Sequence, residues 1–495
     1  MTAKCIMVLG TTSGAGKSWL TTALCRHYAR QGLKVAPFKA QNMSNNARVV
    51  AGQRRGDAFE WGEIGSAQYF QALAARAMPD VRMNPLLLKP EADTRSQVVL
   101  LGQVHPELTA MPWRGRSEHV WPHIRQALDE LRDSHDVVVI EGAGSPAEIN
   151  LHASDIVNMR VARYAGARCL LVSDIDRGGA FAHLYGTWAL LPAEERQLIR
   201  GFVLNKFRGD ASLLAPAPQM LQDLTGVPTV ATLPMYYGHG LPEEDGVFDD
   251  RTHTAGALRL TVAVVAYPRI SNLDEFQALK NVPGVRLVWA RSPADVAHAD
   301  WIVLPGSKHT GSDLAWLRAQ GLDQAVSAHA EKGGAVLGIC GGLQMLGEAL
   351  IDTHGVESIE SSNAPGLGLL PLVTAFAQDK TVQPSHGRLS VHGGPWAALD
   401  GVAVSGYEIH HGQTALHPAM VANGVKAHEV LPGLAWQNEA GNVLGLYLHG
   451  LFEDPAVLQA LFGASAPTLD GVFNHLADFL AQHTAPGVLE ELISN

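Results

Sequence analysis

Cysteine is scarce in this chain of 495 residues, which has only Cys5, Cys25, Cys169 and Cys340. They form no close pair and no metal-type spacing, which excludes a disulfide-rich secreted domain and a zinc finger. No apolar run reaches the roughly 18 residues that a membrane-spanning helix needs, and the apolar part of the N-terminus is too short for a signal peptide. We therefore expect a cytoplasmic protein without a membrane segment.

An excess of positive charge is also absent. The formal net charge is −11 and the sequence pI is about 6.0. This argues against a nucleic-acid-binding surface, but it leaves room for a local basic pocket that binds an acidic ligand. The composition, with 46% hydrophobic and 17% charged residues, is typical of a globular protein. We expect small-molecule substrates, and the sequence does not indicate an oligomeric state.

Short apolar strands alternate with amphipathic stretches in the first half of the chain, which predicts a mostly parallel sheet covered by helices. These strands are predicted at 5–9, 34–38, 136–140, 169–173 and 201–205. The pattern weakens over 210–257, which we interpret as the last elements of a domain followed by a linker that includes 243–245.

A second α/β series then begins, with strands predicted at 258–266, 285–289, 301–304 and 335–339. Antiparallel strands are expected over 366–404, and an amphipathic helix over 473–483. The predicted fold class is α/β, because strands and helices alternate in both series. The predicted divisions are an N-terminal domain at 1–250, a second domain at 251–460 and a helical segment at 461–495.

The segment Gly10–Ser18 lies between a predicted strand and a helix-like run, the context of a phosphate-binding loop. Backbone N–H groups would surround the phosphates, Lys17 would reach the β- and γ-phosphate oxygens, and Ser18 would bind Mg²⁺. Thr11 stands where the usual pattern has its first glycine, and the same shifted loop occurs in dethiobiotin-synthetase-like ATPases, which this segment resembles. An ordinary glycine-rich turn is the alternative. The predicted ATP-binding residues are Gly10, Thr11, Thr12, Ser13, Gly14, Ala15, Gly16, Lys17, Ser18 and Asn205.

Polar residues at other strand ends are further candidates, because ligands of open α/β sheets gather at the carboxyl edge. Glu141 is predicted to bind Mg²⁺ together with Ser18, although it could instead accept hydrogen bonds from the glycine loop that follows it. Asn205 ends another strand, and in related ATPases an asparagine at such a place reads adenine. Asp174 and Asp176 would help to hold metal or substrate, or would only cap the following turn.

Cys340 is the strongest candidate for covalent chemistry. It follows the apolar run 335–339 and is flanked by Gly338, Gly341 and Gly342, the small residues that a sharp strand-to-helix turn requires. Such a turn would lift the sulfur to the carboxyl edge of a sheet and place it at a helix N-terminus. A buried, inert cysteine is the alternative.

A thiol that attacks an amide needs a base, and His449, which follows another predicted strand, is the best-placed candidate. Cys340 and His449 together resemble the class I glutamine amidotransferase domain, in which a thiolate attacks the glutamine side-chain carbonyl and ammonia leaves. The resemblance implies an oxyanion hole formed by backbone N–H groups of Gly306, Ser307 and Gly341. Most members carry His-x-Glu, but Leu451 stands there in this chain. A Cys–His dyad, or an orienting group from elsewhere, is therefore expected.

Motifs across nearly the whole chain resemble the cobyrinate and cobyric acid amidotransferase family. They are 37–44, 142–150, 174–179, 267–272, 304–308, 338–342 and 407–410. The resemblance implies an ATP-binding ligase domain, a glutamine amidotransferase domain, and the use of ATP, Mg²⁺ and glutamine to amidate the b, d, e and g carboxylates of a corrinoid, adenosylcobyrinic acid a,c-diamide.

Other interpretations stay open at this point. The family branch that amidates the a and c carboxylates generally carries an acidic Gly-Pro-Asp-type segment after Pro-Phe-Lys, where this chain has Ala40–Asn46, without a carboxylate. A non-enzymatic phosphate-loop switch fused to an inactive amidotransferase module conflicts with the intact Lys17, Ser18, Cys340 and His449. A cysteine hydrolase without ligase activity does not account for the phosphate loop.

Overall fold

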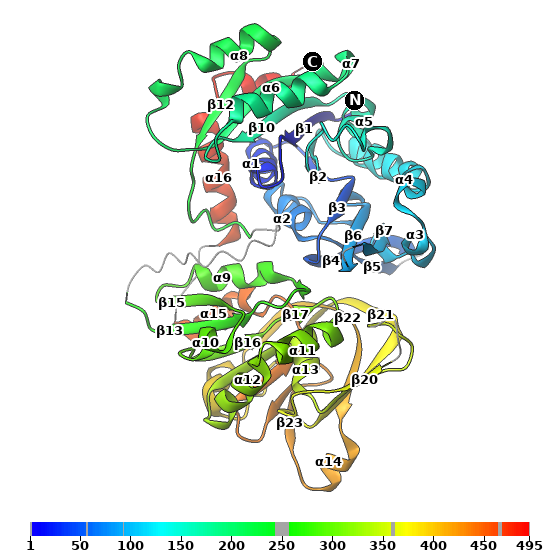
Figure 1. The fold of residues 1–495 in the computed structure, drawn as a ribbon, viewed down its shortest axis with the longest axis vertical. Helices are drawn as coiled ribbons and strands as arrows, with labels where there is room; N and C mark the ends of the chain where they lie inside the picture. Colours follow the sequence, from blue (N-terminus) through cyan, green and yellow to red (C-terminus); the bar gives the residue numbers. More distant parts are fainter. Residues whose placement is uncertain are drawn as a thin grey trace.

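The computed structural model describes residues 2–55, 58–92, 94–242, 257–357, 362–463 and 468–494. Figure 1 shows two main bodies, with the first half of the chain (blue to green) above and the second half (green to orange) below. The predicted division at 250/251 and the acidic stretch 243–245 lie outside the described residues.

The first body is built on a parallel sheet of six strands in the order β12-β11-β10-β1-β9-β2. Alternate side chains of a strand point to opposite faces, so Ile6 and Val8 enter one hydrophobic core while Met7 and Leu9 enter the other. All five predicted strands are present. The strands are β1 (Lys4–Gly10), β2 (Val35–Phe38), β9 (Val137–Glu141), β10 (Arg168–Asp174), β11 (Ile199–Phe207) and β12 (Thr229–Pro234).

Helices flank this sheet, as the alternating pattern predicts. They are α1 (Lys17–Arg30), α2 (Ser66–Ala74), α3 (Pro106–Ala110), α4 (Trp113–Ser134), α5 (Met159–Ala165), α6 (Ala180–Leu190), α7 (Ala193–Arg196) and α8 (Ala217–Thr225).

A set of small strands between β2 and α3 was not predicted from the sequence. One sheet contains β3 (Gln41–Met43), β6 (Leu86–Ala92), β7 (Arg95–Leu100) and β8 (Gln103–Val104), and a separate antiparallel pair contains β4 (Ala47–Arg55) and β5 (Ala58–Gly65). In Figure 1 these strands lie on the side of the first body that faces the second.

The second body has a seven-stranded sheet in the order β15-β13-β16-β18-β25-β24-β23, parallel except at β24 and β23. Its strands are β13 (Leu260–Val265), β15 (Val285–Ala290), β16 (Trp301–Leu304), β18 (Ala335–Ile339), β23 (Ala427–Leu431), β24 (Ala435–Asn438) and β25 (Val443–Leu446). The four predicted strands of this half are therefore confirmed. Its helices are α9 (Gln277–Lys280), α10 (Pro293–Val296), α11 (Thr310–Ala319), α12 (Leu322–Glu331), α13 (Gly341–Leu346), α14 (Pro418–Ala422) and α15 (Pro455–Phe462).

A second, smaller sheet contains the antiparallel strands expected near 366–404. The long strands β21 (Leu372–Arg388) and β22 (Ala403–Leu416) pair antiparallel, beside β19 (Ala349–Asp352) and β20 (Ser362–Pro365). A short antiparallel pair, β14 (Ile270–Ser271) with β17 (Gly306–Ser307), joins two loops at the carboxyl edge of the larger sheet.

The C-terminal helices α16 (Leu469–His483) and α17 (Val488–Ile493) return to the first body, as the red helix in Figure 1 shows. Leu476 and Leu480 are buried in the same core as Ile6, and the Tyr28 hydroxyl donates to the Leu489 carbonyl over 2.8 Å. The helix predicted over 473–483 is present, but its position against α1 was not predicted. Among the described residues, no helix has the length and apolar character needed to span a membrane.

Candidate active sites

The predicted phosphate loop connects β1 to α1 at the carboxyl edge of the first sheet. Gly14 and Gly16 have positive φ angles of 71° and 102°, which glycine adopts without the strain of a side chain. Lys17 lies along the loop, and its Nζ donates to the carbonyls of Thr12 (3.2 Å) and Gly144 (3.3 Å). The backbone therefore has the curved form that a phosphate-binding loop requires.

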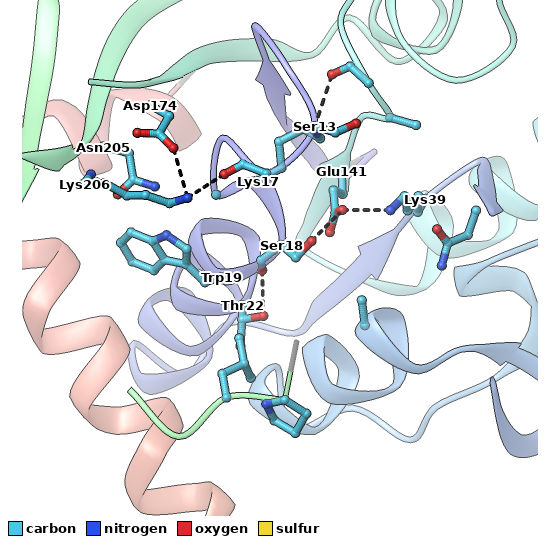
Figure 2. Close-up of a pocket in the computed structure, with 18 of the residues that line it drawn as sticks. Ser13, Lys17, Ser18, Trp19, Thr22, Lys39, Glu141, Asp174, Asn205 and Lys206 are labelled. Carbon is cyan, nitrogen blue, oxygen red and sulfur yellow. Dashed lines mark hydrogen bonds and ion pairs between the residues drawn. The ribbon is translucent and has the colours of Figure 1, made fainter. Parts of the chain in front are cut away.

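This loop borders a cavity of about 1210 Å³. Figure 2 shows the cavity with Lys17, Ser18 and Trp19 at its wall. Of the predicted ATP-binding residues, those that line the cavity are Ser13, Gly14, Gly16, Lys17, Ser18 and Asn205. The other four do not line it: Thr11 donates to the Ser173 hydroxyl, Ala15 is buried, the Thr12 carbonyl accepts from Lys17, and Gly10 lies against the Lys17 side chain.

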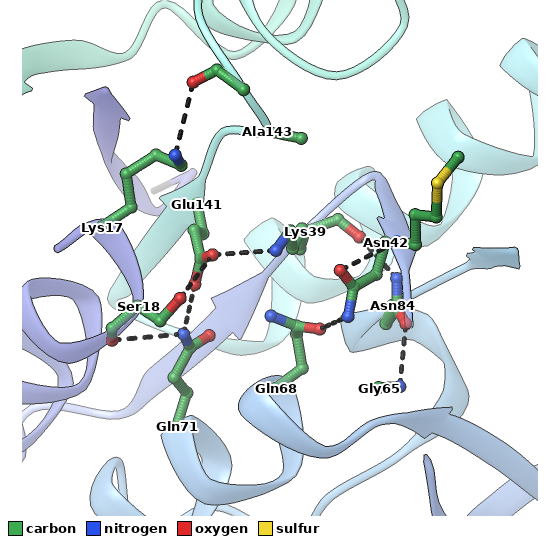
Figure 3. A network of polar contacts seen from close by, with 12 residues as sticks. Lys17, Ser18, Lys39, Asn42, Gly65, Gln68, Gln71, Asn84, Glu141 and Ala143 are labelled. Carbon is green, nitrogen blue, oxygen red and sulfur yellow. Dashed lines mark hydrogen bonds and ion pairs between the residues drawn. The ribbon is translucent and has the colours of Figure 1, made fainter. Parts of the chain in front are cut away.

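Glu141 ends β9 and lies beside Ser18, its predicted partner in metal binding. Its Oε1 accepts hydrogen bonds from the Ser18 hydroxyl (2.9 Å) and the Lys39 ammonium (2.8 Å), and its Oε2 accepts from Gln71 (2.5 Å), as Figure 3 shows. Burial alone would raise the pKa of Glu141, but Lys39, Gln71 and Lys17 lower it. The carboxylate is therefore held in its charged form, as a metal ligand must be.

Asn205 lies directly against the phosphate loop. Its Nδ2 donates to the Ala15 carbonyl over 2.8 Å, and its Oδ1 accepts from the Lys206 amide over 2.8 Å. A Cβ atom on Gly16 would lie 2.0 Å from this Nδ2, so the loop needs glycine there. The side chain thus supports the loop, and its role in reading adenine stays a prediction.

Asp174 and Asp176 are both paired with cations at the rim of the same cavity. Asp174 Oδ2 lies 3.0 Å from Lys206 Nζ, and Asp176 pairs with Arg208. Neither Lys39 nor Lys206 was predicted as a site residue. The sequence did contain a signal for both. Lys39 directly follows strand β2, and Lys206 directly follows the strand predicted at 201–205.

The second site is centred on Cys340, between β18 and α13. Its φ and ψ angles are 51° and −105°, a backbone conformation rare for a residue with a side chain. A Cβ atom on Gly342 would lie 1.9 Å from the Leu304 carbonyl, and one on Gly338 would lie 2.5 Å from Leu346. The predicted strand-to-helix elbow is therefore present, and its glycines are required by close backbone contacts.

His449 is buried beside Cys340, and both line one cavity. Its Nδ1 lies 3.2 Å from Oε1 of Glu275, whose Oε2 accepts from the Gly450 amide over 2.9 Å. Burial alone would lower the pKa of His449, but the Glu275 carboxylate and then Cys340 raise it to about 10. Glu275 thus occupies the position of an orienting group, which the missing His-x-Glu motif left open.

Sequence reasoning did not identify Glu275, which lies 174 residues before His449. It belongs to the 3₁₀ turn Leu273–Phe276, which follows β14. The acidic residues next to His449 have other partners: Glu453 pairs with Arg48, and Asp454 caps α15.

The predicted oxyanion loop lies next to the thiol. A Cβ atom on Gly341 would lie 2.8 Å from the Ser307 nitrogen, and one on Gly306 would lie 2.9 Å from Cε1 of His449. Ser307 Oγ donates to Asp313 over 2.6 Å, which fixes the loop. The backbones of Ser307 and Gly341 therefore lie against each other beside Cys340.

Comparisons with known proteins agree with this two-site arrangement. A family model described as "CobQ/CobB/MinD/ParA nucleotide binding domain" matches residues 6–243, and one described as "CobB/CobQ-like glutamine amidotransferase domain" matches residues 261–457. A cobyric acid synthase from Acidovorax ebreus (strain TPSY) is 76% identical over 99% of both chains. Proteins of the same name from Variovorax paradoxus (strain S110) and Polaromonas naphthalenivorans (strain CJ2) are 75% and 73% identical, each over 100% of both chains. The chain therefore belongs to the cobyric acid synthase family.

Proposed function

We propose that this protein is a glutamine-hydrolysing, ATP-dependent ligase that amidates the b, d, e and g carboxylates of adenosylcobyrinic acid a,c-diamide to give cobyric acid. The observation that carries the proposal is the presence, in one chain, of a phosphate loop at one sheet edge and a Cys–His–Glu cluster at another. The full-length relatives that are named cobyric acid synthase support the substrate. The four cysteines are unpaired, which suits a cytosolic enzyme.

The glutaminase step uses Cys340 as the nucleophile. His449, whose Nδ1 contacts Glu275 and whose raised pKa favours its protonated form, holds the proton that the thiol gives up, and the thiolate sulfur attacks the side-chain carbonyl carbon of glutamine. The N–H groups of Ser307 and Gly341 stabilise the negative oxygen of the tetrahedral intermediate. His449 then returns the proton to the leaving nitrogen, and ammonia departs. Water hydrolyses the thioester to glutamate and restores the thiol.

The ligase step takes place at the phosphate loop. A substrate carboxylate oxygen attacks the γ-phosphorus of ATP, which gives an acyl phosphate and ADP, while Lys17 stabilises the charge on the transferred group. Ammonia then attacks the acyl carbon, and phosphate leaves as the amide forms. A carboxylate is a poor acyl donor until it is phosphorylated, which is why the two sites must cooperate.

The residues at the phosphate loop fit a magnesium ion. The Ser18 hydroxyl and the ionised Glu141 carboxylate are hard oxygen donors, and they lie 2.9 Å apart. The described residues contain no cluster of three or more His, Cys, Asp or Glu side chains that could hold a metal ion alone. Ser18 and Glu141 would therefore share the ion with nucleotide phosphates and water. Bound there, Mg²⁺ would neutralise charge on the β- and γ-phosphates.

The large cavity supports a bulky second substrate beside ATP. At about 1210 Å³ it exceeds the roughly 300–1,000 Å³ of an ordinary ligand pocket. Its wall includes Gln277, Lys280 and Asn281 from the second body as well as the phosphate loop. A corrinoid would thus bind between the two bodies, with its carboxylates towards Lys17.

The test is the product made from the a,c-diamide, ATP and glutamine. Mass spectrometry should show four successive losses of about one mass unit, each from an OH-to-NH₂ exchange. Cys340→Ala should lose the glutamine-supported activity but keep the activity at high ammonia, whereas Lys17→Ala should lose both. A substrate that gains no amide groups, or a Cys340→Ala variant that still uses glutamine, would reject the proposal.

A further inference from the structure

The cavity at Cys340 is built by both bodies and carries an unusual set of charges. Asn45 and Lys89 come from the first body, and the remaining lining residues come from the second. The described lining is Asn45, Lys89, Ser271, Asn272, Ser307, Lys308, Thr310, Cys340, Gln344, Glu357, Lys380, Ile409, His410, His411 and His449. It thus contains three lysines and, among the described residues, a single carboxylate.

The three lysines have their ion-pair partners outside the cavity. Lys89 and Lys380 share Glu63, at 2.8 Å and 2.5 Å, and Lys308 lies 3.2 Å from Glu91. Two carboxylates therefore serve three ammonium groups, and Glu91 is shared with Arg95 as well. When all three lysines are protonated and Glu357 is neutral, these groups carry at least one excess positive charge.

The pKa of Lys380 is strongly lowered in this surrounding. Its side chain is 11% exposed, and burial, together with Lys89 and Lys308, lowers its pKa to about 7 even though Glu63 raises it. An anion bound in the cavity would restore the full charge of Lys380. The pocket is therefore arranged to accept a negative group.

Glu357 gives the cavity the opposite charge at a separate point. Its Oε2 accepts from the Thr310 amide over 2.6 Å, and its own amide donates to Asp352 over 2.8 Å. Burial raises its pKa to about 7, only partly offset by Lys308, and no ion pair within 4 Å involves it in the described structure. A cation bound beside it would stabilise the ionised carboxylate.

We propose that Lys308 and Lys380 bind the α-carboxylate of glutamine and that Glu357 binds its α-ammonium, while the side-chain amide lies at Cys340. The inference rests on the proposed glutaminase activity and specifies how that site selects its substrate. A free amino acid carries these two charges on one carbon, so it matches neighbouring cationic and anionic groups. An amide that lacks either charge leaves the lysines or Glu357 without a partner in the pocket. The site therefore selects glutamine over such amides.

The lysine positions depend on the first body, because Glu63 and Glu91 belong to β5 and β6. Glu63 joins Lys89, of its own body, to Lys380, and Glu91 holds Lys308. The amidotransferase body alone would therefore lack the groups that position two of its three binding residues. Glutamine selection thus becomes a property of the assembled chain.

The experiment compares glutamine with two analogues that each lack one charge. Glutaramate has no α-ammonium, and 4-aminobutanamide has no α-carboxylate. Ammonia release is measured in the full-length protein, with inhibition constants against glutamine where turnover of an analogue is too slow. Wild type should prefer glutamine to both analogues, and equal use of all three would overturn the proposal.

Glu357→Gln should raise the KM for glutamine on the order of 10- to 100-fold, because a charge-assisted hydrogen bond to the α-ammonium is lost. The binding of glutaramate, which has no α-ammonium, should be nearly unchanged. Lys380→Met should weaken the binding of glutamine and of glutaramate by a similar factor. The binding of 4-aminobutanamide should be nearly unchanged. Lys380→Arg, which keeps the charge, should retain most of the binding of glutaramate.

Lys332→Met is the matched control, because Lys332 is an exposed lysine of the same body. Ammonia-dependent ligase activity should persist in every variant and shows that each one is folded. Equal losses with glutamine and both analogues would mean that Glu357 and Lys380 only hold the pocket together, and would overturn the proposal. Glutamine hydrolysis that survives in Cys340→Ala would instead reject the glutaminase assignment itself.

Discussion

Arg48 of strand β4 forms a buried ion pair with Asp274, the residue directly before Glu275. Arg48 also contacts Glu453, at 2.6 Å, and its guanidinium lies over the ring of Tyr407 at 5.3 Å. Four residues thus connect the small strands of the first body to the turn that holds His449. The contacts of Arg48 therefore connect the structure around Cys340 and His449 to the position of the first body.

Arg48→Ala should destabilise the protein and impair glutamine use together. The side chain of Asp274 is fully buried, so removing Arg48 leaves an uncompensated charge, at a cost of about 3–5 kcal/mol. The adjacent Glu275 would then lose its fixed position, and the ratio of glutamine-dependent to ammonia-dependent activity should fall. Urea unfolding and the two activity assays measure these effects.

Arg30→Ala is the control for this variant. Arg30 pairs with Asp478 at the surface, where both side chains are more than 40% exposed, and such a pair contributes about 0–1 kcal/mol. If Arg48→Ala lost no more stability than Arg30→Ala, the buried pair would have no structural importance.

Gly341→Ala should impair the glutaminase reaction without preventing folding. The added Cβ would lie 2.8 Å from the Ser307 nitrogen and would push one oxyanion donor away. The kcat for glutamine hydrolysis should fall on the order of 10²-fold, the usual effect of a lost donor, while ammonia-dependent activity persists. Gly311→Ala, in helix α11 with open space around it, should leave kcat unchanged.

Gly16→Ala should damage ATP binding through a direct clash. Its Cβ would lie 2.0 Å from Asn205 Nδ2, in addition to the strain of a positive φ angle. Gly32→Ala, just after α1, carries the same type of strain, about 1–2 kcal/mol, but meets nothing within 4 Å. We expect Gly16→Ala to lower kcat/KM for ATP at least tenfold more than Gly32→Ala. Similar losses in both variants would show that strain alone is responsible.

The two central motifs were predictable because each is continuous in sequence. Gly10–Ser18 and the elbow at Cys340 are strand-turn-helix segments whose glycines carry the geometry. Glu275 was not predictable in this way. It reaches His449 only because β14 pairs with β17 and brings a distant turn to the same sheet edge.

The position of the C-terminal helix α16 in the fold could also not be predicted from the local sequence pattern. The spacing of apolar residues predicted the helix α16 but contains no information about which sheet it covers. The small strands β3 to β8 were missed for a related reason. They pair through contacts across the segment, and most of their side chains do not alternate cleanly between polar and apolar.

Leu476→Ala tests whether α16 belongs to the first core. Leu476 is fully buried among residues of β1 and α1, so its truncation should cost about 2–5 kcal/mol of unfolding free energy. Leu224→Ala, on α8, removes a side chain that is 64% exposed and should change stability by less than about 0.5 kcal/mol. Equal effects in urea unfolding would place α16 outside the core.

Glu275→Gln should change how stability depends on pH. Burial alone would lower the pKa of His449, but Glu275 and then Cys340 raise it from the ordinary 6.5 to about 10. Because the folded-state pKa is above the unfolded one, protonated His449 stabilises the fold. This stabilisation is fully present below about pH 6.5 and is lost as the pH rises through about 10.

Without the Glu275 carboxylate, the folded-state pKa of His449 should fall towards its ordinary value. The unfolding free energy of Glu275→Gln should therefore decline less between pH 6.5 and 10 than that of the wild type, as urea unfolding across this range would measure. Glu453→Gln is the matched control, because Glu453 contacts Arg48 and makes no hydrogen bond to His449 in the described structure. It should keep the wild-type slope. Parallel curves for Glu275→Gln and the wild type would mean that Glu275 does not hold the proton on His449.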